Sequence, residues 1–409
     1  MHKFGLAAIL SLAVLSSPAN AEKLEVTHWW TSGSEAAAVK VLADAFNKTG
    51  NVWVDGAIAG SGGTARPLIV SRIMGGDPMG ATQFTHGSAM RELIQAGKMR
   101  DITDVAKRKG WTDKIYPPSL LQSCTFEDRI YCVPSNIHSQ QWLWLSTKVY
   151  KDAGLPVPKN WNEFVASAPA LEQKGVVPLA LGRGPVPIWI AFHALYLGLG
   201  GPEAYLKTFK DKDAEFVEGP QIAGVFKALD EARKLAAKSK VQQWNLAAQM
   251  QIEGRAAGQI MGDWIQGEFN RAGMKPGQDY ECLLGMGMND FISANGDAFF
   301  FPKTADAKKI AAQDTLAAVI SDPKVQTDFA SVKGALPVRT DVHPADNNVC
   351  LERGLQALRA GHVVDSVNQL LSPDSITRMT DLMVEFFAEM SISPEQAQQE
   401  FADLIASAD

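Results

Sequence analysis

Trp29 and Trp30 stand side by side where a strand should end, in the stretch EVTHWWTSGSEAA at residues 25–37. A flat indole can cover the apolar C–H face of a sugar ring, because it offers a large rigid surface at low entropy cost. Successive side chains of a strand point to opposite faces, so at most one of the two rings can face the same core. The pair therefore predicts one core ring and one ring for a ligand, and the sequence leaves open which is which.

Polar and aromatic side chains also gather at three other predicted strand ends. These ends carry Gln83 to His86, Asn136 to His138, and Asp263 with Trp264. Sugar hydroxyls both donate and accept hydrogen bonds, and carboxylates, amides and imidazoles can hold them. Ligands of open parallel sheets bind beyond the carboxyl ends of the strands. These ends therefore predict a site for a polyhydroxylated ligand, with a core role as the alternative for each single tryptophan.

The other motifs that could do chemistry are weaker. GSGGTAR at residues 60–66 is glycine-rich but lacks the spacing of a phosphate-binding loop, so we interpret it as a turn. Neither G-x-S-x-G nor H-E-x-x-H occurs, and His193 lies in an apolar stretch that favours a core position. Asp263 and Asp297 could form the carboxylate pair of a glycosidase, but the sequence does not fix their separation. Cysteine and histidine spacing indicates no metal, and we expect no cofactor.

The elements that must position these residues follow a strand–helix rhythm. KLEVTHW at residues 23–29 predicts a strand, and SEAAAVKVLADAFNKTG at 34–50 predicts a helix capped by Gly33 or Ser34. Further strands are expected at 52–58, 81–87, 141–146, 176–182 and 258–264, and further helices at 64–76, 88–98, 160–175, 186–200, 374–390 and 393–407. Such alternation is typical of parallel, doubly wound α/β sheets, here in two units.

The chain of 409 residues is too long for one ordinary core, which favours two lobes. MHKFGLAAILSLAVLSSPANA at residues 1–21 has the charge, apolar run and A-x-A ending of a secretory signal peptide, so we predict export and cleavage after Ala21. No later stretch is long and apolar enough to cross a membrane. The formal net charge of −6 and the lack of a basic run argue against a nucleic-acid partner.

The chain has four cysteines, and an even number in an exported protein favours disulfides, for which the sequence alone allows three connectivities. CTFEDRIYC at residues 124–132 predicts two short strands around a Glu–Asp turn, which would bring its two cysteines together. We favour the pairs Cys124–Cys132 and Cys282–Cys350, with unpaired buried thiols as the alternative.

Eight segments, in order along most of the chain, carry a family resemblance: WWTSGSE, QFTHG, VPSNIHSQQWLW, PKNWNEF, GRAAGQIMGDWIQGEF, PGQDYEC, GDAFFFPK and VKGALPVRTDV. NWNEF and LPVRTDV are common to many solute-binding proteins, whereas N-x-H followed by W-x-W, and IMGDW-x-x-GEF, are more specific. Together these segments resemble the periplasmic sugar-binding proteins of ABC transporters, and among them the glucose/mannose-binding branch.

The resemblance implies a Venus flytrap similar to the type II periplasmic binding proteins, with two doubly wound α/β lobes joined by a hinge and a sugar in the cleft between them. We expect the N-terminal lobe over residues 22–134 and about 293–335, and the C-terminal lobe over about 135–292 and 336–409. The resemblance also implies a periplasmic protein that binds glucose or a related hexose and delivers it to the permease subunits in the membrane. We expect it to be a monomer.

Carried over by position, the resemblance implies these sugar-binding residues: Trp29, Trp30, Glu35, Gln83, His86, Trp244, Trp264, Asp297, Lys333 and Gln369. It places Asn136 and His138 at the hinge or behind the sugar-binding side chains, and it supports the Cys282–Cys350 disulfide. One departure stands in SVNQLLS at residues 366–372, where Gln369 replaces an expected histidine and Leu370 an expected glycine. Glutamine still donates and accepts, so the departure leaves a sugar as the expected ligand and weakens the case for glucose itself.

Three functions compete on these grounds. The first is a binding protein without turnover, which closes on a monosaccharide and feeds a permease. The second is a secreted glycoside hydrolase that uses Asp263 and Asp297 and releases reducing sugar. The third is a module that binds sugar and signals by docking on a sensor. Titration with a panel of sugars separates binding from turnover.

Overall fold

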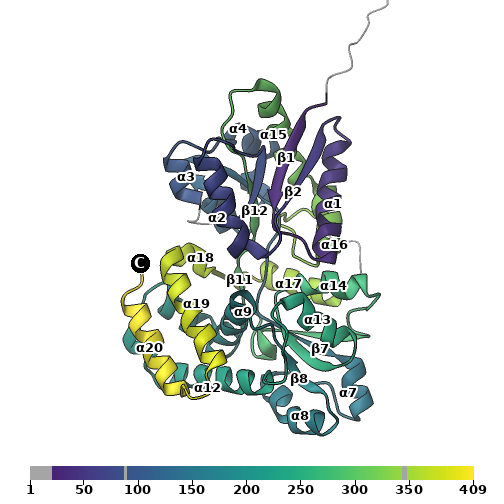
Figure 1. Ribbon diagram of the computed structural model, residues 1–409, viewed down its shortest axis with the longest axis vertical. Coiled ribbons are helices and arrows are strands. Elements are labelled where there is room, and N and C mark those ends of the chain that lie inside the picture. Colours follow the sequence, from purple (N-terminus) through teal and green to yellow (C-terminus); the bar gives the residue numbers. More distant parts are fainter. Residues whose placement is uncertain (1–20, 87–89, 343–347) are drawn as a thin grey trace, which may run out of the picture.

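The computed structural model describes residues 21–86, 90–342 and 348–409, which form two α/β lobes stacked along the long axis of the molecule (Figure 1). The signal peptide predicted over residues 1–21 lies outside the described residues, apart from Ala21. Among the described helices, none has the length and apolar character needed to span a membrane. The limits predicted for the two lobes remain a prediction.

The upper lobe is built on a five-stranded sheet in the order β2 (Val52–Ala57), β1 (Lys23–His28), β3 (Ala81–Thr85), β12 (Asp297–Phe300) and β6 (Cys132–Pro134). Around it lie α1 (Gly33–Asn47), α2 (Ser61–Met74), α3 (Arg91–Gln95), α4 (Thr103–Lys109), α5 (Trp111–Lys114), α6 (Pro118–Ser123), α15 (Ala307–Ile320) and α16 (Pro323–Lys333). β1, β2 and β3 are parallel, as predicted. β12 runs antiparallel to both neighbours, because it enters the sheet from the other lobe and not through a βαβ unit.

The lower lobe holds a four-stranded sheet in the order β10 (Tyr280–Leu284), β7 (Trp142–Ser146), β9 (Ala256–Ile260) and β8 (Val177–Ala180). Only β8 and β9 are parallel, so this sheet is mixed as well. Its helices are α7 (Thr147–Ala153), α8 (Trp161–Gln173), α9 (Pro185–Leu195), α10 (Gly201–Phe209), α11 (Ala214–Val217), α12 (Pro220–Leu235), α13 (Trp244–Ile252), α14 (Ile265–Arg271), α17 (Val349–Arg359), α18 (Val367–Leu370), α19 (Pro373–Ala388) and α20 (Pro394–Ala406). Two short strands, β11 (Ile292–Ala294) and β13 (Val363–Asp365), form a separate parallel pair.

Helix starts follow local capping chemistry. Asn160 caps α8 as predicted, since its side chain accepts from the backbone N–H of Glu163. The predicted caps of α1 were wrong by one or two positions. Ser32 caps this helix and forms a reciprocal capping box with Glu35.

Three chain segments run side by side between the lobes. Ile137 bridges to Leu336, and His138 bridges to Asn295, each in antiparallel fashion. The segments that contain these residues connect β6 to β7, β11 to β12, and α16 to the lower lobe. Asn136 and His138 therefore lie in the strip between the lobes, and their role at a hinge stays a prediction.

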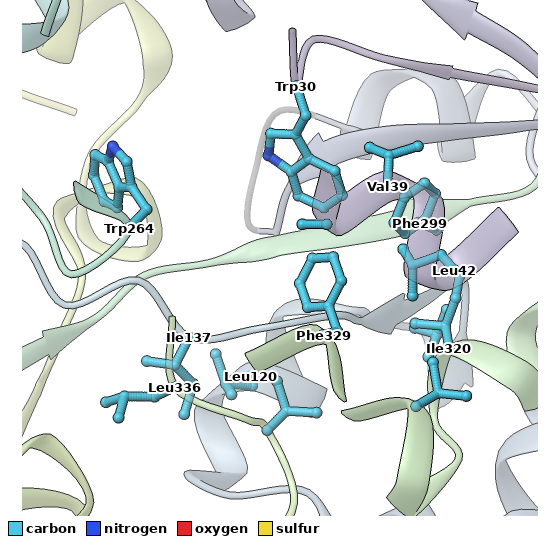
Figure 2. Close-up of a cluster of buried hydrophobic side chains, with 14 of the residues drawn as sticks. Trp30, Val39, Leu42, Leu120, Ile137, Trp264, Phe299, Ile320, Phe329 and Leu336 are labelled. Atoms are coloured by element: carbon cyan, nitrogen blue, oxygen red, sulfur yellow. The ribbon is translucent and has the colours of Figure 1, made fainter. Parts of the chain in front are cut away.

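Large side chains fill the core beside the first sheet. Figure 2 shows Trp30 packed with Phe299 and Phe329, and Trp264 apart from these rings, on the left of the view. Trp30, Phe299 and Phe329 are each no more than 2 % exposed. In the lower lobe, His193 is also buried, and its Nδ1 lies 3.1 Å from the Trp189 carbonyl oxygen, which agrees with the core position predicted for it.

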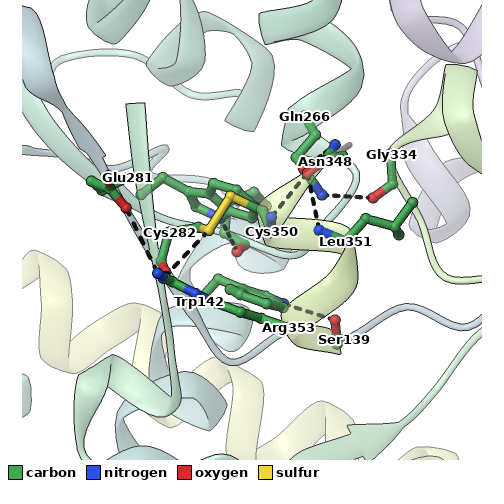
Figure 3. Close-up of a disulfide and its surroundings, with 12 residues drawn as sticks. Ser139, Trp142, Gln266, Glu281, Cys282, Gly334, Asn348, Cys350, Leu351 and Arg353 are labelled. Atoms are coloured by element: carbon green, nitrogen blue, oxygen red, sulfur yellow. Dashed lines mark hydrogen bonds and ion pairs between the residues drawn. A yellow bond between two sulfur atoms is a disulfide. The ribbon is translucent and has the colours of Figure 1, made fainter. Parts of the chain in front are cut away.

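Both predicted disulfides are present. Cys124 and Cys132 close a hairpin of β4 (Thr125–Phe126) and β5 (Arg129–Ile130), whose turn residues Glu127 and Asp128 have positive φ angles of 48° and 60°. Cys282 and Cys350 join β10 to α17, next to Trp142 (Figure 3). The second bond links positions 68 residues apart. It holds α17 against the lower sheet because Cys282 belongs to β10 of that sheet.

Candidate ligand site between the lobes

The two neighbouring tryptophans differ in burial. Trp30 is 2 % exposed, and its ring centre lies 5.8 Å from that of Phe299 and 5.5 Å from that of Phe329. Trp29 is half-buried and makes an edge contact with Phe84 at 6.0 Å, and it packs against two hydrophobic clusters, the one that contains Trp30 and the one that contains Phe84. The two rings thus have different neighbours: Trp30 is a core residue, and Trp29 is the more accessible ring.

Lys333, at the end of α16, lies between tryptophans of both lobes. Its Nζ atom is 5.5 Å from the centre of the Trp30 ring and 5.9 Å from that of Trp264. The same ammonium faces Glu35 Oε1 at 3.4 Å, and Trp244 meets Trp264 edge-on at 6.4 Å. The structure therefore brings together five of the predicted site residues, from α1, α13, α16 and two loops.

Asp297 and His138 extend this group toward the strip between the lobes. His138 stacks obliquely on Trp264, with ring centres 4.6 Å apart, and its Nε2 lies 3.4 Å from Asp297 Oδ2 without hydrogen-bond geometry. Gln83 accepts from the Trp29 backbone N–H at 3.0 Å. His86 donates its backbone N–H to Gly296, the residue before Asp297. All four side chains lie at one end of the upper sheet.

Buried polar atoms that have no hydrogen-bond partner among the described residues concentrate at this end. They include Gln83 Nε2, both ring nitrogens of His86, Asn136 Nδ2, His138 Nε2, Asp263 Oδ1 and Asp297 Oδ2. Such groups cost free energy unless a partner is supplied, and buried polar groups of folded proteins nearly always have one. The set contains both donors and acceptors, which is the requirement for holding sugar hydroxyls.

Burial also shifts the acid–base equilibria of these groups. It raises the pKa of Asp297 to about 6, although Lys333 acts in the opposite direction. It raises the pKa of Asp263 to about 7, even though the backbone N–H and hydroxyl of Ser139 both donate to this carboxylate. It lowers the pKa of His86 to about 4 and that of His138 well below its usual value, so both imidazoles are neutral at neutral pH.

Gln369 is the one predicted sugar-binding residue whose contacts lie elsewhere. Its Oε1 accepts from the Ser366 backbone N–H, which makes the pair a capping box at the start of α18, and its Nε2 donates to the Ser119 carbonyl oxygen at 3.1 Å. It lines a separate cavity of about 190 Å³ beside α6. The glutamine at this position therefore caps α18 and also joins it to α6 of the upper lobe.

Sequence reasoning missed Arg66, whose guanidinium lies 5.3 Å from the centre of the Trp29 ring. Residues 60–66 were interpreted as a turn and a helix was expected from residue 64, but α2 already begins at Ser61, so the turn was wrong. The early start was missed because Gly62 and Gly63 have low helix propensity. The signal available in the sequence was an arginine placed about one helical turn after these two glycines.

The lobes also touch beside the cluster. Glu268, on α14, accepts from both the backbone N–H and the hydroxyl of Ser34, on α1, at 3.2 and 2.8 Å. Among the described residues, no group of three or more His, Cys, Asp or Glu side chains could hold a metal ion. The structure thus brings polar and aromatic side chains together where the two lobes are in contact.

The chain matches the profile of the bacterial extracellular solute-binding proteins over residues 30–326. It is 34 % identical over 366 residues to a probable sugar-binding periplasmic protein of Brucella melitensis, covering 87 % of this chain and 86 % of that protein. A protein of the same description from Mesorhizobium japonicum is 35 % identical over 360 residues, covering 87 % and 85 %. The chain therefore belongs to the bacterial extracellular solute-binding protein family.

Solved structures with the same fold include a chitin oligosaccharide binding protein, with a TM-score of 0.76 and 18 % identity, covering 95 % of this chain and 99 % of that one. The bacterial solute receptor AcbH, described as preferring β-D-galactopyranose, gives a TM-score of 0.75 at 18 % identity, covering 93 % and 97 %. At this identity the likeness establishes the fold, a two-lobed α/β solute-binding protein, and not the ligand.

Proposed function

We propose that this chain is the periplasmic sugar-binding component of an ABC importer. In this proposal the lobes close on one sugar, and the closed complex delivers it to the permease subunits. The glucose/mannose-binding branch and a hexose ligand are the finer part of the proposal, and a monomer is its expected state. The chain would be exported and cut after Ala21, which sequencing the N-terminus of the mature protein tests directly.

The observation that carries the proposal is that Lys333 lies 5.9 Å from the Trp264 ring of the lower lobe, beside Asp297 Oδ2, which has no hydrogen-bond partner among the described residues. Trp29 is the more accessible ring of the upper lobe. Indole rings suit the C–H face of a sugar, and charged donors and acceptors suit its hydroxyls. Glu35, Gln83 and His86 would add hydroxyl contacts from the upper lobe. The names of the related proteins from Brucella and Mesorhizobium support a sugar as the ligand.

Sugar titration tests the proposal. Because Trp29, Trp30, Trp244 and Trp264 adjoin the site, binding should change intrinsic fluorescence and raise the melting temperature. A panel of hexoses, pentoses and short oligosaccharides identifies the ligand. A panel with neither change for any sugar would refute the proposal.

Asp297→Asn supplies the second arm of the test. We expect this substitution to weaken sugar binding by roughly ten- to hundredfold, since it removes a charged hydrogen-bond acceptor. Asp44→Asn, on the outer face of α1, is the matched control and should bind as the wild type does.

The hydrolase alternative predicts a different result. Asp263 and Asp297 are both buried carboxyls with raised pKa values, which would suit a general acid. Release of reducing sugar from aryl glycosides, lost in Asp297→Asn, would favour an enzyme. Binding without any release favours the transport component.

A further inference from the structure

Arg66 projects from α2 toward the end of the sheet that carries the tryptophan pair. Its guanidinium lies 5.3 Å from the Trp29 ring centre, and its Nη2 donates to Thr85 Oγ1 at 2.5 Å. A Cβ atom at Gly62 would lie 3.3 Å from the guanidinium, so a glycine there lets the guanidinium pack closely on the preceding turn. An indole, a hydroxyl and a helical turn therefore fix the position of this cation.

The sheet register sets that position relative to Asp297. Thr85 stands directly opposite Asp297 in the antiparallel pair of β3 and β12. A hydrogen bond to Thr85 therefore brings Arg66 to the same sheet end as the Asp297 carboxyl. The two charges attract each other through space, but they form no ion pair, and Asp297 Oδ2 instead lies 3.4 Å from Nε2 of the neutral His138 imidazole.

Arg66 keeps an unused donor at this place. Its Nε is buried and has no hydrogen-bond partner among the described residues. Burial lowers the pKa of Arg66 and the Asp297 carboxylate opposes this shift, so the guanidinium is enclosed beside an acceptor that it does not bind. A buried charged donor without an acceptor carries a substantial desolvation cost, which a ligand oxygen could remove.

Arg66 and Asp297 together suit two neighbouring hydroxyls of one sugar. A hydroxyl that accepts from a guanidinium can stand next to a hydroxyl that donates to a carboxylate, because each hydroxyl does both. The site already contains the carboxyls of Glu35, Asp263 and Asp297 against the two cations Arg66 and Lys333. Charge balance therefore favours a neutral sugar over a uronic acid.

We infer that Arg66 is a specificity-determining residue, which donates from Nε to one hydroxyl of a neutral sugar. Its guanidinium also holds the Trp29 ring in place against that sugar. This inference deepens the proposed function and depends on it. Arg66 is not among the residues that the family resemblance carries over.

The test compares Arg66→Met with Arg72→Met, a substitution of the same kind on the same helix. Arg72 pairs with Glu25 at the other end of α2, away from the site. With the sugar that binds the wild type, we expect roughly ten- to hundredfold weaker binding for Arg66→Met, since hydrogen bonds to charged groups have this strength, and no change for Arg72→Met. Melting temperatures without sugar show whether each variant is folded.

Singly deoxygenated analogues of that sugar then separate contact from indirect support. If Arg66 touches one hydroxyl, the analogue that lacks this hydroxyl should bind Arg66→Met and the wild type almost equally, while the other analogues keep the full difference. An equal loss for every analogue, or no loss for the parent sugar, would overturn the inference and leave the proposed function intact. A wild type that binds no sugar in the panel overturns both.

Discussion

Trp29 and Trp30 are neighbours in sequence with different surroundings, so alanine substitutions should separate binding from stability. Trp30→Ala opens a cavity between Phe299 and Phe329, and we expect it to lower the free energy of unfolding by about 3–5 kcal/mol. Trp29→Ala removes a half-buried ring beside Arg66, and we expect weaker sugar binding with a smaller loss of stability. Urea unfolding and sugar titration of both variants measure this contrast, and equal losses of stability would contradict it.

Asp263 should make stability fall as pH rises. Its folded-state pKa of about 7 lies above the value near 4 of an unfolded chain, so the native state binds the extra proton between these values. The contribution of this group is therefore complete below about pH 4 and is lost as pH rises through about 7. Asp297 acts in the same direction, whereas the lowered pKa of His86 acts in the opposite one.

Asp263→Asn isolates this effect, because it removes one titrating group and keeps an oxygen for Ser139. We expect the variant to gain unfolding free energy over the wild type as pH rises from about 4 to about 7, by at most roughly 1.4 kcal/mol for each step of one in pH. Urea unfolding at several pH values measures the difference. A gain that grows toward acid pH would show that the carboxyl is stabilised in its charged form.

At the scale of elements, the start of α1 combines a helix cap with a contact to the candidate site. Ser32 and Glu35 form the capping box, and the second carboxylate oxygen of Glu35 faces Lys333. Ser32→Ala should lower the free energy of unfolding by roughly 1 kcal/mol through the lost cap. Glu35→Gln keeps a capping-box residue and removes the negative charge that faces the buried Lys333, so it should weaken sugar binding more than Ser32→Ala does. Equal weakening of sugar binding by the two variants in titration experiments would contradict this division.

The two disulfides should differ in what they contribute to stability. In the loop-entropy account, a bond that closes a longer loop restricts the unfolded chain more. Replacing Cys282 and Cys350, 68 residues apart, with serine should cost about 4 kcal/mol, against about 2.5 kcal/mol for Cys124 and Cys132, 8 residues apart. Urea unfolding of the two double variants gives the order, and an equal cost would show that loop length does not decide it.

At the scale of the whole molecule, Gly267 is a position at which the proposed closure of the lobes can be tested. It lies on α14 of the lower lobe, and a Cβ atom there would stand 2.8 Å from the Ser34 Cβ and 3.1 Å from the Lys333 carbonyl oxygen, both in the upper lobe. Gly267→Ala therefore opposes only the state in which the lobes touch. Since apparent affinity scales with the population of the competent state, we expect at least roughly tenfold weaker sugar binding at an unchanged melting temperature of the free protein.

Gly224→Ala is the matched control for this substitution. Gly224 lies in α12, and a Cβ atom there would meet nothing within 4 Å. Sugar titration should give this variant the affinity of the wild type. If Gly267→Ala binds as tightly as this control does, contact at Ser34 is not required for binding.

Short-range chemistry determined much of this protein from its sequence. The asparagine cap of α8, the hairpin between Cys124 and Cys132, and the division of Trp29 from Trp30 all follow from residues at most a few positions apart. The same rules explain the start of α1, where the predicted cap was wrong, because Ser32 and Glu35 form a capping box. Ser366 and Gln369 have the same spacing and form a second capping box at α18, while sugar binding by Gln369 stays a prediction.

Only the tertiary structure decided which polar residues meet. Lys333 contacts both Trp30 and Trp264 because two lobes pack together, and β12 runs antiparallel because it arrives from the other lobe. Arg66 reaches the end of the sheet through a hydrogen bond to Thr85, whose place opposite Asp297 is set by strand register. Contacts between residues hundreds of positions apart depend on the packing of whole elements, which no local spacing in the sequence encodes.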